Sequence, residues 1–262
     1  MKLLLLGNSM DRQRDVPSEQ RRGSLMAREL EAATGEPVEI VTKGFWPSAR
    51  VAGLVGQWLE EEQPDLLLIT ATAYPFAYPS VPLRVARLLG PLGKPVRRAG
   101  VGAANTPWLA HNAIFRALRR FAQVTIGGAT YLTVDEVIAN ISDAVRVAVR
   151  HEDVVVVLKG PGGGGRYQPT ARASRAAEAK RQRVLDALEK LCAEVHVDFI
   201  RHDIPDYVRN PEVPLIGDGI HGLTEYHEVA AGELTPALIA AWQRHHTPTP
   251  NRLPAIGTEP RA

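Results

Sequence analysis

Residues 3–10 read LLLLGNSM: four consecutive leucines lead into a glycine, an asparagine and a serine. A short, continuous apolar run is typical of a strand that is buried on both faces of a parallel sheet. A glycine directly after such a strand permits a tight turn. We therefore expect Leu3–Leu6 to form the first strand and Ser9 to lie in the turn behind it.

The same alternation continues along the chain, since short apolar runs are followed by longer amphipathic segments. Strands are predicted over residues 3–6, 38–42, 66–72, 154–158 and 195–200. Helices are predicted over residues 18–33, with Ser18 as a candidate cap, 49–62, 134–150, 171–194 and 224–245, with Pro236 as a candidate break point. The segment Thr133–Glu136 has the spacing of a capping box. Strands that alternate with helices indicate a parallel sheet covered on both faces. The fold class is therefore predicted as α/β, a three-layer α/β/α sandwich with a five-stranded parallel sheet.

Residues 75–132 interrupt this rhythm as a long insertion after the third strand. An apolar helix is expected near 81–90 and a second one near 107–122, with Arg116, Arg119 and Arg120 on the latter. Because functional residues of such sheets gather at the carboxyl ends of the strands, the insertion is interpreted as a lid or pocket wall. The alternative is an outer helical layer. The whole pattern indicates one domain over residues 1–246 and a flexible, Pro-rich tail over 247–262.

Composition narrows the class of protein. The 262 residues carry a formal net charge of +2, with 45% hydrophobic and 23% charged residues, which is usual for a soluble globular protein. The small net charge argues against a nucleic-acid-binding module. The single cysteine, Cys192, excludes an intramolecular disulfide and a cysteine-based zinc cluster, and we expect it to be a small core residue. No apolar run approaches 18 residues, and the opening leucines are too few for a signal peptide, so a cytoplasmic protein without a membrane span is expected.

Three features of the sequence indicate a candidate catalytic site. Ser9 can direct its hydroxyl, and its amide, into the crevice at the carboxyl edge of the sheet. Asp218 lies three residues before His221, so its carboxylate can orient the imidazole, which then acts as a base towards a serine hydroxyl. Gly44 ends the second predicted strand and can offer its amide to an oxyanion. Taken singly, these features could be a helix cap, a solvated loop and a turn glycine.

Two other motifs are weaker. The run Gly160–Gly165 lacks the Gly-Lys-Ser/Thr ending of a phosphate-binding loop, which favours a loop over the crevice. The histidines show no metal-ligand spacing, and a packing or surface role is favoured for His227.

Taken together, these positions resemble the SGNH hydrolase superfamily, also called GDSL-type esterases and lipases. The resemblance covers residues 3–245 apart from the insertion. Residues 7–10 (GNSM) correspond to the family's Gly-Asp-Ser-Leu block, with Ser9 at the nucleophile position and Asn8 in place of the aspartate. Asp218 and His221 match the family's final Asp-x-x-His block, and Gly44 matches its second-block glycine.

The third block departs from the family pattern. The family has Gly-x-Asn-Asp after the third strand, and the asparagine is a third oxyanion donor. Residues 72–75 here read TAYP, and Tyr74 stands about where the asparagine would be. Thr72 or Tyr74 is therefore a candidate substitute through its hydroxyl. Loss of one oxyanion donor costs about 10²–10³ in turnover.

The resemblance implies a serine hydrolase that cleaves a small-molecule carboxylic ester, such as an acyl ester, a lipid or an acylated sugar, with a Ser9–His221–Asp218 triad. It implies no cofactor and no metal. No nucleic acid is expected as a partner, and the oligomeric state is left open. Because the third block differs, two alternatives are a weakly catalytic or non-catalytic binding protein on the same fold and an acyltransferase.

Overall fold

The structure is a computed structural model of the 262-residue chain. It describes residues 1–12, 16–95, 98, 100, 112–163, 168–201 and 223–246.

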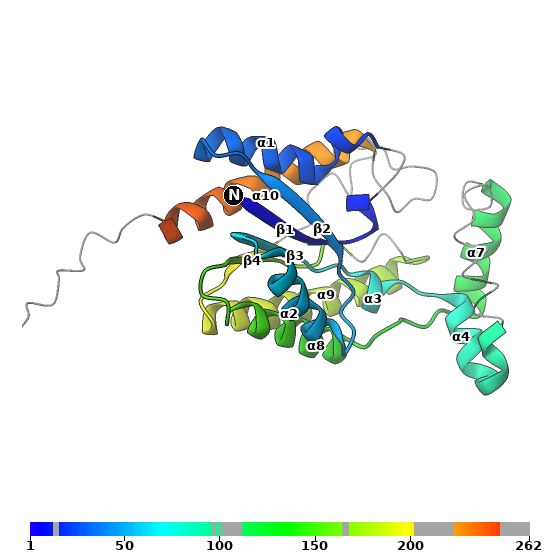
Figure 1. The fold of residues 1–262 in the computed structure, drawn as a ribbon. Helices are drawn as coiled ribbons and strands as arrows, with labels where there is room; N and C mark the ends of the chain where they lie inside the picture. The colour runs from blue at the N-terminus through cyan, green and yellow to red at the C-terminus, as the bar shows by residue number, and fades with distance from the viewer. Residues whose placement is uncertain are drawn as a thin grey trace, which may run out of the picture.

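A five-stranded parallel sheet forms the middle of the molecule (Figure 1). Its strands are β1 (Lys2–Gly7), β2 (Glu39–Gly44), β3 (Leu66–Thr70), β4 (Val155–Lys159) and β5 (Asp198–Ile200). Their order is β2-β1-β3-β4-β5, so β1 lies between β2 and β3. The predicted first strand is confirmed, and all four of its leucines are fully buried.

Helices cover both faces of this sheet, which confirms the three layers (Figure 1). One layer holds α1 (Arg22–Thr34) and α10 (Thr224–His246), which pack on Leu3 and Leu5 of β1. The other holds α2 (Val51–Glu62), α8 (Val134–Ala148) and α9 (Ala171–Glu194), which pack on Leu4 and Leu6. Successive side chains of a strand point to opposite faces, so the leucine run supplies both cores.

Local signals explain some of the helix ends and not others. The Thr133 hydroxyl accepts from the Glu136 amide at 3.2 Å, and the Glu136 carboxylate accepts from the Thr133 amide at 2.7 Å, so the predicted capping box is present. Ser18 does not cap α1, contrary to the prediction. It begins a separate 3-10 turn, η2 (Ser18–Gln20), and α1 starts at Arg22 after an extended residue.

The predicted break at Pro236 is wrong, because α10 continues through it. Proline removes one amide from the helix, but buried neighbours on either side hold the helix against the sheet. Leu234 and Leu238 are buried, and the Thr235 hydroxyl donates to the Ala231 carbonyl at 2.9 Å. The packing of this apolar face outweighs the local preference of proline to end a helix.

The fifth strand is shorter than predicted. It begins at Asp198 rather than Val195, because His196 has a left-handed backbone with φ of 57°. An L-residue in this region turns the chain and is incompatible with a strand. Cys192, just before this turn, is buried as expected.

The insertion contains α3 (Tyr74–Ala77), α4 (Val81–Leu88), the 3-10 turn η3 (Gly90–Leu92) and α7 (Ala113–Thr125). Asn112 caps α7 by accepting from two amides, so that helix starts later than the predicted residue 107. Residues 107–111 lie outside the described residues. α4 and α7 contact each other and stand apart from the layers, beyond the carboxyl edge of the sheet (Figure 1).

The base of the insertion is closed by a short backbone bridge. The amide of Ser80 donates to the Ala129 carbonyl at 3.0 Å, and the reverse bond measures 3.1 Å. Gly128 fits here because a Cβ at this position would lie 2.4 Å from the Pro79 backbone. We name α4, η3 and α7 together the arm.

No helix in the described part of the chain is long and apolar enough to cross a membrane. The predicted tail, residues 247–262, lies outside the described residues.

Candidate active site

Ser9 lies at the carboxyl end of β1, as predicted. β1 ends at Gly7, and Ser9 is the first residue of the 3-10 turn η1 (Ser9–Arg12), where it is exposed. The turn is closed by the Asp11 amide, which donates to the Asn8 carbonyl at 3.2 Å. The serine is thus presented to solvent at the edge where catalytic groups of parallel sheets gather.

A buried carboxylate holds this turn in place. Asp11 Oδ2 accepts from the Asn8 amide at 2.8 Å, and Asp11 Oδ1 accepts from Arg22 Nη2 at 2.5 Å and from Arg22 Nε at 2.9 Å. Asp11 and Arg22 are only 7% and 5% exposed. A Cβ on Gly7 would lie 2.0 Å from Asp11 Oδ2, so the glycine makes room for the carboxylate. The Ser9 turn is therefore fixed to α1 through an ion pair that we did not predict from the sequence.

The network extends to α10. The Arg22 amide donates to Nδ1 of His227, which is 1% exposed, at 3.1 Å. Next to it, the Thr224 hydroxyl donates to Gln20 Oε1 at 3.1 Å. Of the packing or surface role predicted for His227, the packing role is confirmed. The start of α10 is thereby attached to the helix that holds the Ser9 turn.

Gly44 lies beside this turn, because it is the last residue of β2 and pairs in register with Gly7. The amide of the next residue, Phe45, donates to the Gly7 carbonyl at 2.7 Å. Phe45 therefore completes the hydrogen-bond ladder between β1 and β2. Gly44 itself is exposed, beside the strand that leads to Ser9.

Thr72 and Tyr74 follow β3 on the other side of β1. The strand end is anchored by Thr70, whose hydroxyl donates to the Leu6 carbonyl at 2.8 Å. Thr72 and Tyr74 are both half-buried. In the order 2-1-3-4-5, the connections from β1 and β3 leave on opposite faces, and the crevice between them is the usual ligand site of such sheets.

Tyr74 belongs to an aromatic cluster above the sheet edge. Its ring stacks on Tyr78 with centroids 4.5 Å apart and on Tyr131 with centroids 5.7 Å apart. Trp46 meets Tyr131 edge-on at 5.7 Å and is 41% exposed. The cluster joins the residues that follow β2 and β3 to the segment before α8, and it forms an apolar wall near the candidate site.

Asp218 and His221 lie outside the described residues. His221 stands three positions before Thr224 in the sequence. The start of α10 is therefore the described segment that follows it most closely.

No group of three or more His, Cys, Asp or Glu side chains in the described residues could hold a metal ion.

The pKa of Glu233 on α10 is raised because its side chain is partly buried. The positive charge of Lys159, at the end of β4, counteracts that rise.

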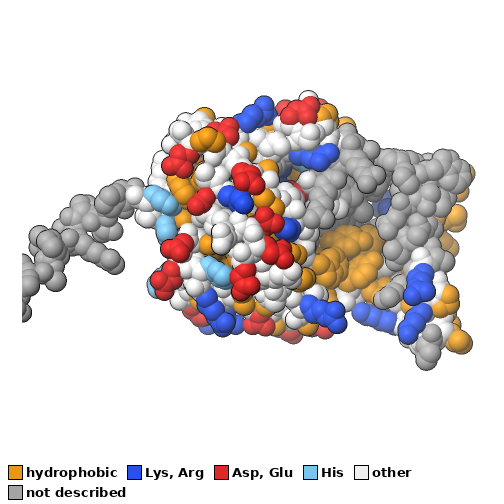
Figure 2. All heavy atoms as spheres, in the orientation of Figure 1, with side chains coloured by type: hydrophobic (Ala, Val, Ile, Leu, Met, Phe, Trp, Pro, Cys, Tyr) orange, Lys and Arg blue, Asp and Glu red, His pale blue; other side chains and the backbone are white. Residues whose placement is uncertain are grey.

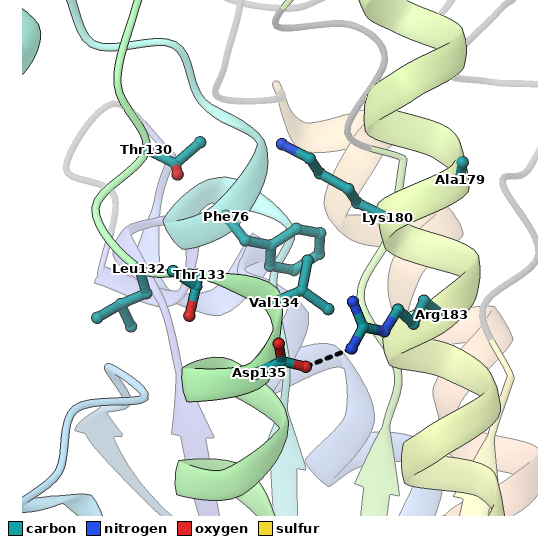
Figure 3. A pocket seen from close by; sticks show the side chains of 9 residues that line it. All are labelled: Phe76, Thr130, Leu132, Thr133, Val134, Asp135, Ala179, Lys180 and Arg183. Carbon is teal, nitrogen blue, oxygen red and sulfur yellow. Dashed lines mark hydrogen bonds and ion pairs between the residues drawn. The ribbon is translucent and has the colours of Figure 1, made fainter.

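A separate cavity of about 450 Å³ lies between α3, the start of α8 and α9 (Figure 3). The Phe76 ring lines it from α3, and an ion pair between Asp135 and Arg183 lies at one side. Lys180 extends over it from α9. None of the predicted site residues lines this cavity.

Known proteins resemble this chain in structure and not in sequence. No family model matches it, and no curated protein matches it either. Among solved structures, that of TesA is 13% identical with a TM-score of 0.55, and the match covers 92% of this chain and 99% of TesA. The esterase EstA from Pseudoalteromonas sp. is 11% identical with a TM-score of 0.51, covering 93% and 98%.

A mutant of Axe2, an acetylxylan esterase from Geobacillus stearothermophilus, is 14% identical with a TM-score of 0.50, covering 92% of this chain and 93% of Axe2. These matches span the sheet and both helical layers. The chain has the SGNH hydrolase fold. The three-layer α/β/α fold predicted from the alternation of strands and helices is therefore confirmed.

Proposed function

We propose that this chain is a serine hydrolase of the SGNH superfamily that cleaves carboxylic esters of small molecules. The observation that carries the proposal is the position of Ser9. It is exposed in the turn after β1, and the ends of β2 and β3 flank that strand. Solved structures with this fold include esterases.

In the proposed reaction, Ser9 Oγ attacks the ester carbonyl carbon. His221 accepts the hydroxyl proton and returns it to the leaving alcohol, and Asp218 accepts a hydrogen bond from the imidazole. The attachment of the α10 start to the Ser9 turn through His227, Arg22 and Asp11 favours this pairing. Water then releases the acyl group, and the reaction needs no cofactor.

The proposed oxyanion hole uses the amides of Ser9 and Gly44. The Phe45 amide is already bonded to the Gly7 carbonyl, so Gly44 is the better donor on β2. Thr72 or Tyr74 supplies a third donor through its hydroxyl. Each donor of this kind contributes about 10²–10³ in turnover.

The main test is covalent labelling. A fluorophosphonate probe should label Ser9 and the protein should hydrolyse short p-nitrophenyl esters, while Ser9→Ala and His221→Ala abolish both signals. Ser18→Ala and His245→Ala are matched controls at exposed positions and should retain both. A correctly folded protein that is neither labelled nor active overturns the proposal in favour of a binding protein.

Two further measurements refine the mechanism. Thr72→Val and Tyr74→Phe remove only the hydroxyls, and the variant that loses about 10²–10³ in turnover identifies the third donor. Product analysis with added alcohols distinguishes hydrolysis from acyl transfer, because a transferase would form a new ester instead of the free acid.

A further inference from the structure

The arm carries most of the exposed apolar side chains of the described structure. Of the eleven large hydrophobic side chains exposed there, eight lie on the arm or directly next to it. They are Leu88, Leu89, Leu92, Ile114, Leu118, Phe121, Val124 and Ile126. Ile114 is 72% exposed and Phe121 is 66% exposed. Such a concentration of exposed apolar surface indicates an interaction site.

The apolar side chains of α7 form one stripe, and that stripe faces away from the protein. Ile114, Leu118 and Phe121 are spaced by four and three residues, so they share a face of the helix. The opposite side of α7 makes hydrogen bonds to the rest of the protein. Gln123 Nε2 donates to the Pro79 carbonyl at 3.0 Å, and Arg120 Nη2 donates to the Pro169 carbonyl at 3.4 Å. A helix of a soluble protein normally buries its apolar side, and α7 has the reverse orientation.

The charge of this part of the chain is equally one-sided. Residues 75–132 contain no Asp or Glu and eight basic residues, namely Arg84, Arg87, Lys94, Arg97, Arg98, Arg116, Arg119 and Arg120. The acid-free stretch extends from Leu66 to Val134. Because the whole chain has a net charge of only +2, the rest of the protein is net negative by six. Figure 2 shows orange and blue side chains, and no red ones, over the part of the arm that it colours.

The combination of an apolar stripe and positive charge on the arm is complementary to an anionic lipid surface. A helix with a strong apolar face, low mean hydropathy and arginine on its polar side lies in the interface of a membrane. Each Lys or Arg near an anionic leaflet adds electrostatic attraction to it. A second copy of the chain fits less well, because two arms packed together would bring five positive charges against five. A nucleic acid would leave the apolar stripe unexplained.

We propose that the arm docks the protein onto anionic membranes, with α7 lying in the lipid interface. At 13 residues, α7 is too short to span a bilayer, which needs about 20 residues, so the helix lies on the surface. This inference does not depend on catalysis by Ser9.

The test is sedimentation of the full chain with vesicles of phosphatidylcholine alone and of phosphatidylcholine with phosphatidylserine. We expect binding to the anionic vesicles and at least tenfold weaker binding to the neutral ones. The variant Leu118→Ser/Phe121→Ser should weaken binding at least tenfold. The matched control Leu54→Ser/Val229→Ser changes two exposed apolar residues outside the arm and should bind like the unmodified protein.

The charges are tested separately. Arg119→Gln/Arg120→Gln should weaken binding severalfold, whereas Arg28→Gln/Lys190→Gln, which removes two charges on α1 and α9, should not. Raising the salt concentration to 0.5 M should weaken binding as well. All variants should keep the circular dichroism spectrum of the folded protein, because every substituted side chain is at least partly exposed.

Three outcomes overturn the proposal. The first is no binding to anionic vesicles by the folded protein. The second is a dimer in size-exclusion chromatography that Leu118→Ser/Phe121→Ser converts to a monomer without any lipid binding, which assigns the stripe to a second copy. The third is binding to polyglutamate but not to vesicles, which assigns the arm to an acidic protein partner.

Discussion

The close fit between Gly7 and Asp11 leads to a quantitative prediction for the substitution Gly7→Ala. The new methyl group would lie 2.0 Å from Asp11 Oδ2 and 2.6 Å from Asp11 Cγ, so the carboxylate must move. It cannot move without leaving Arg22, which is 5% exposed and bonded to it at 2.5 Å. Disrupting a buried ion pair costs about 3–5 kcal/mol. We therefore expect Gly7→Ala to lower the free energy of unfolding by at least about 3 kcal/mol.

The same substitution should be far milder when Asp11 is already alanine. Of the three atoms nearest to the new methyl group, only the Cβ of residue 11 then remains, at 3.1 Å, which requires a shift of a few tenths of an ångström. Gly7 does not have a positive φ, so alanine fits its backbone conformation and restricts the unfolded chain. In the Asp11→Ala background we expect a cost below about 1.5 kcal/mol, and thus a coupling of at least about 1.5 kcal/mol.

Urea denaturation of the four proteins in this double-mutant cycle, followed by circular dichroism, measures the coupling. If Gly7→Ala costs the same in both backgrounds, within about 0.5 kcal/mol, the steric explanation is wrong. Ester hydrolysis by Gly7→Ala, measured at low urea where it is folded, reports separately on the Ser9 turn.

Three further predictions concern other parts of the fold. Burial raises the pKa of the Cys192 thiol to about 12, so iodoacetamide at pH 8.5 should react with it only after unfolding in urea, and rapid reaction of the native protein would contradict its core position. Thr133→Ala removes the cap of α8 and should cost about 1 kcal/mol in urea denaturation, whereas Thr133→Ser should cost much less. Hydrogen bonds from the Thr133 amide and hydroxyl lower the pKa of Glu136 in the folded protein, so the ionised carboxylate stabilises the fold above its ordinary pKa of 4.5, and this stabilisation is lost as the pH falls through the lower folded value. Glu136→Gln should therefore flatten the fall in the free energy of unfolding between pH 5 and pH 3. An unchanged pH profile would exclude this contribution.

The sequence contains enough information to predict the sheet, because each strand is a run that must be buried. Leu3–Leu6 and the apolar run that begins at Leu66 have only one stable environment in water, namely between two layers of helices. The capping box of α8 is similarly local, since its two partners are three residues apart. Ser9 and Gly44 follow directly from the ends of such strands.

The residues that hold the Ser9 turn could not be predicted in this way. Asp11 and Arg22 each resemble ordinary surface residues in the sequence. His227 is 205 positions away from Arg22, whose amide donates a hydrogen bond to it. Their burial depends on how α1 and α10 pack, which no local pattern contains. The apolar stripe of α7 is a related case, because a periodic pattern reveals an apolar face and not what covers it.

The pairing of β3 with β4 has a consequence for how the chain can tolerate the arm. Leu66 pairs with Val155, which lies 89 positions later, and the whole arm falls within this interval. Because the entropy of closing a loop grows only logarithmically with its length, each doubling of the interval costs about 0.6 kcal/mol. The arm is therefore a thermodynamically inexpensive addition at this point of the chain. The arm instead affects the rate of folding. Strands β1, β2 and β3 are all complete by residue 70, whereas β4 and β5 can join the sheet only after the long intervening segment has been synthesised.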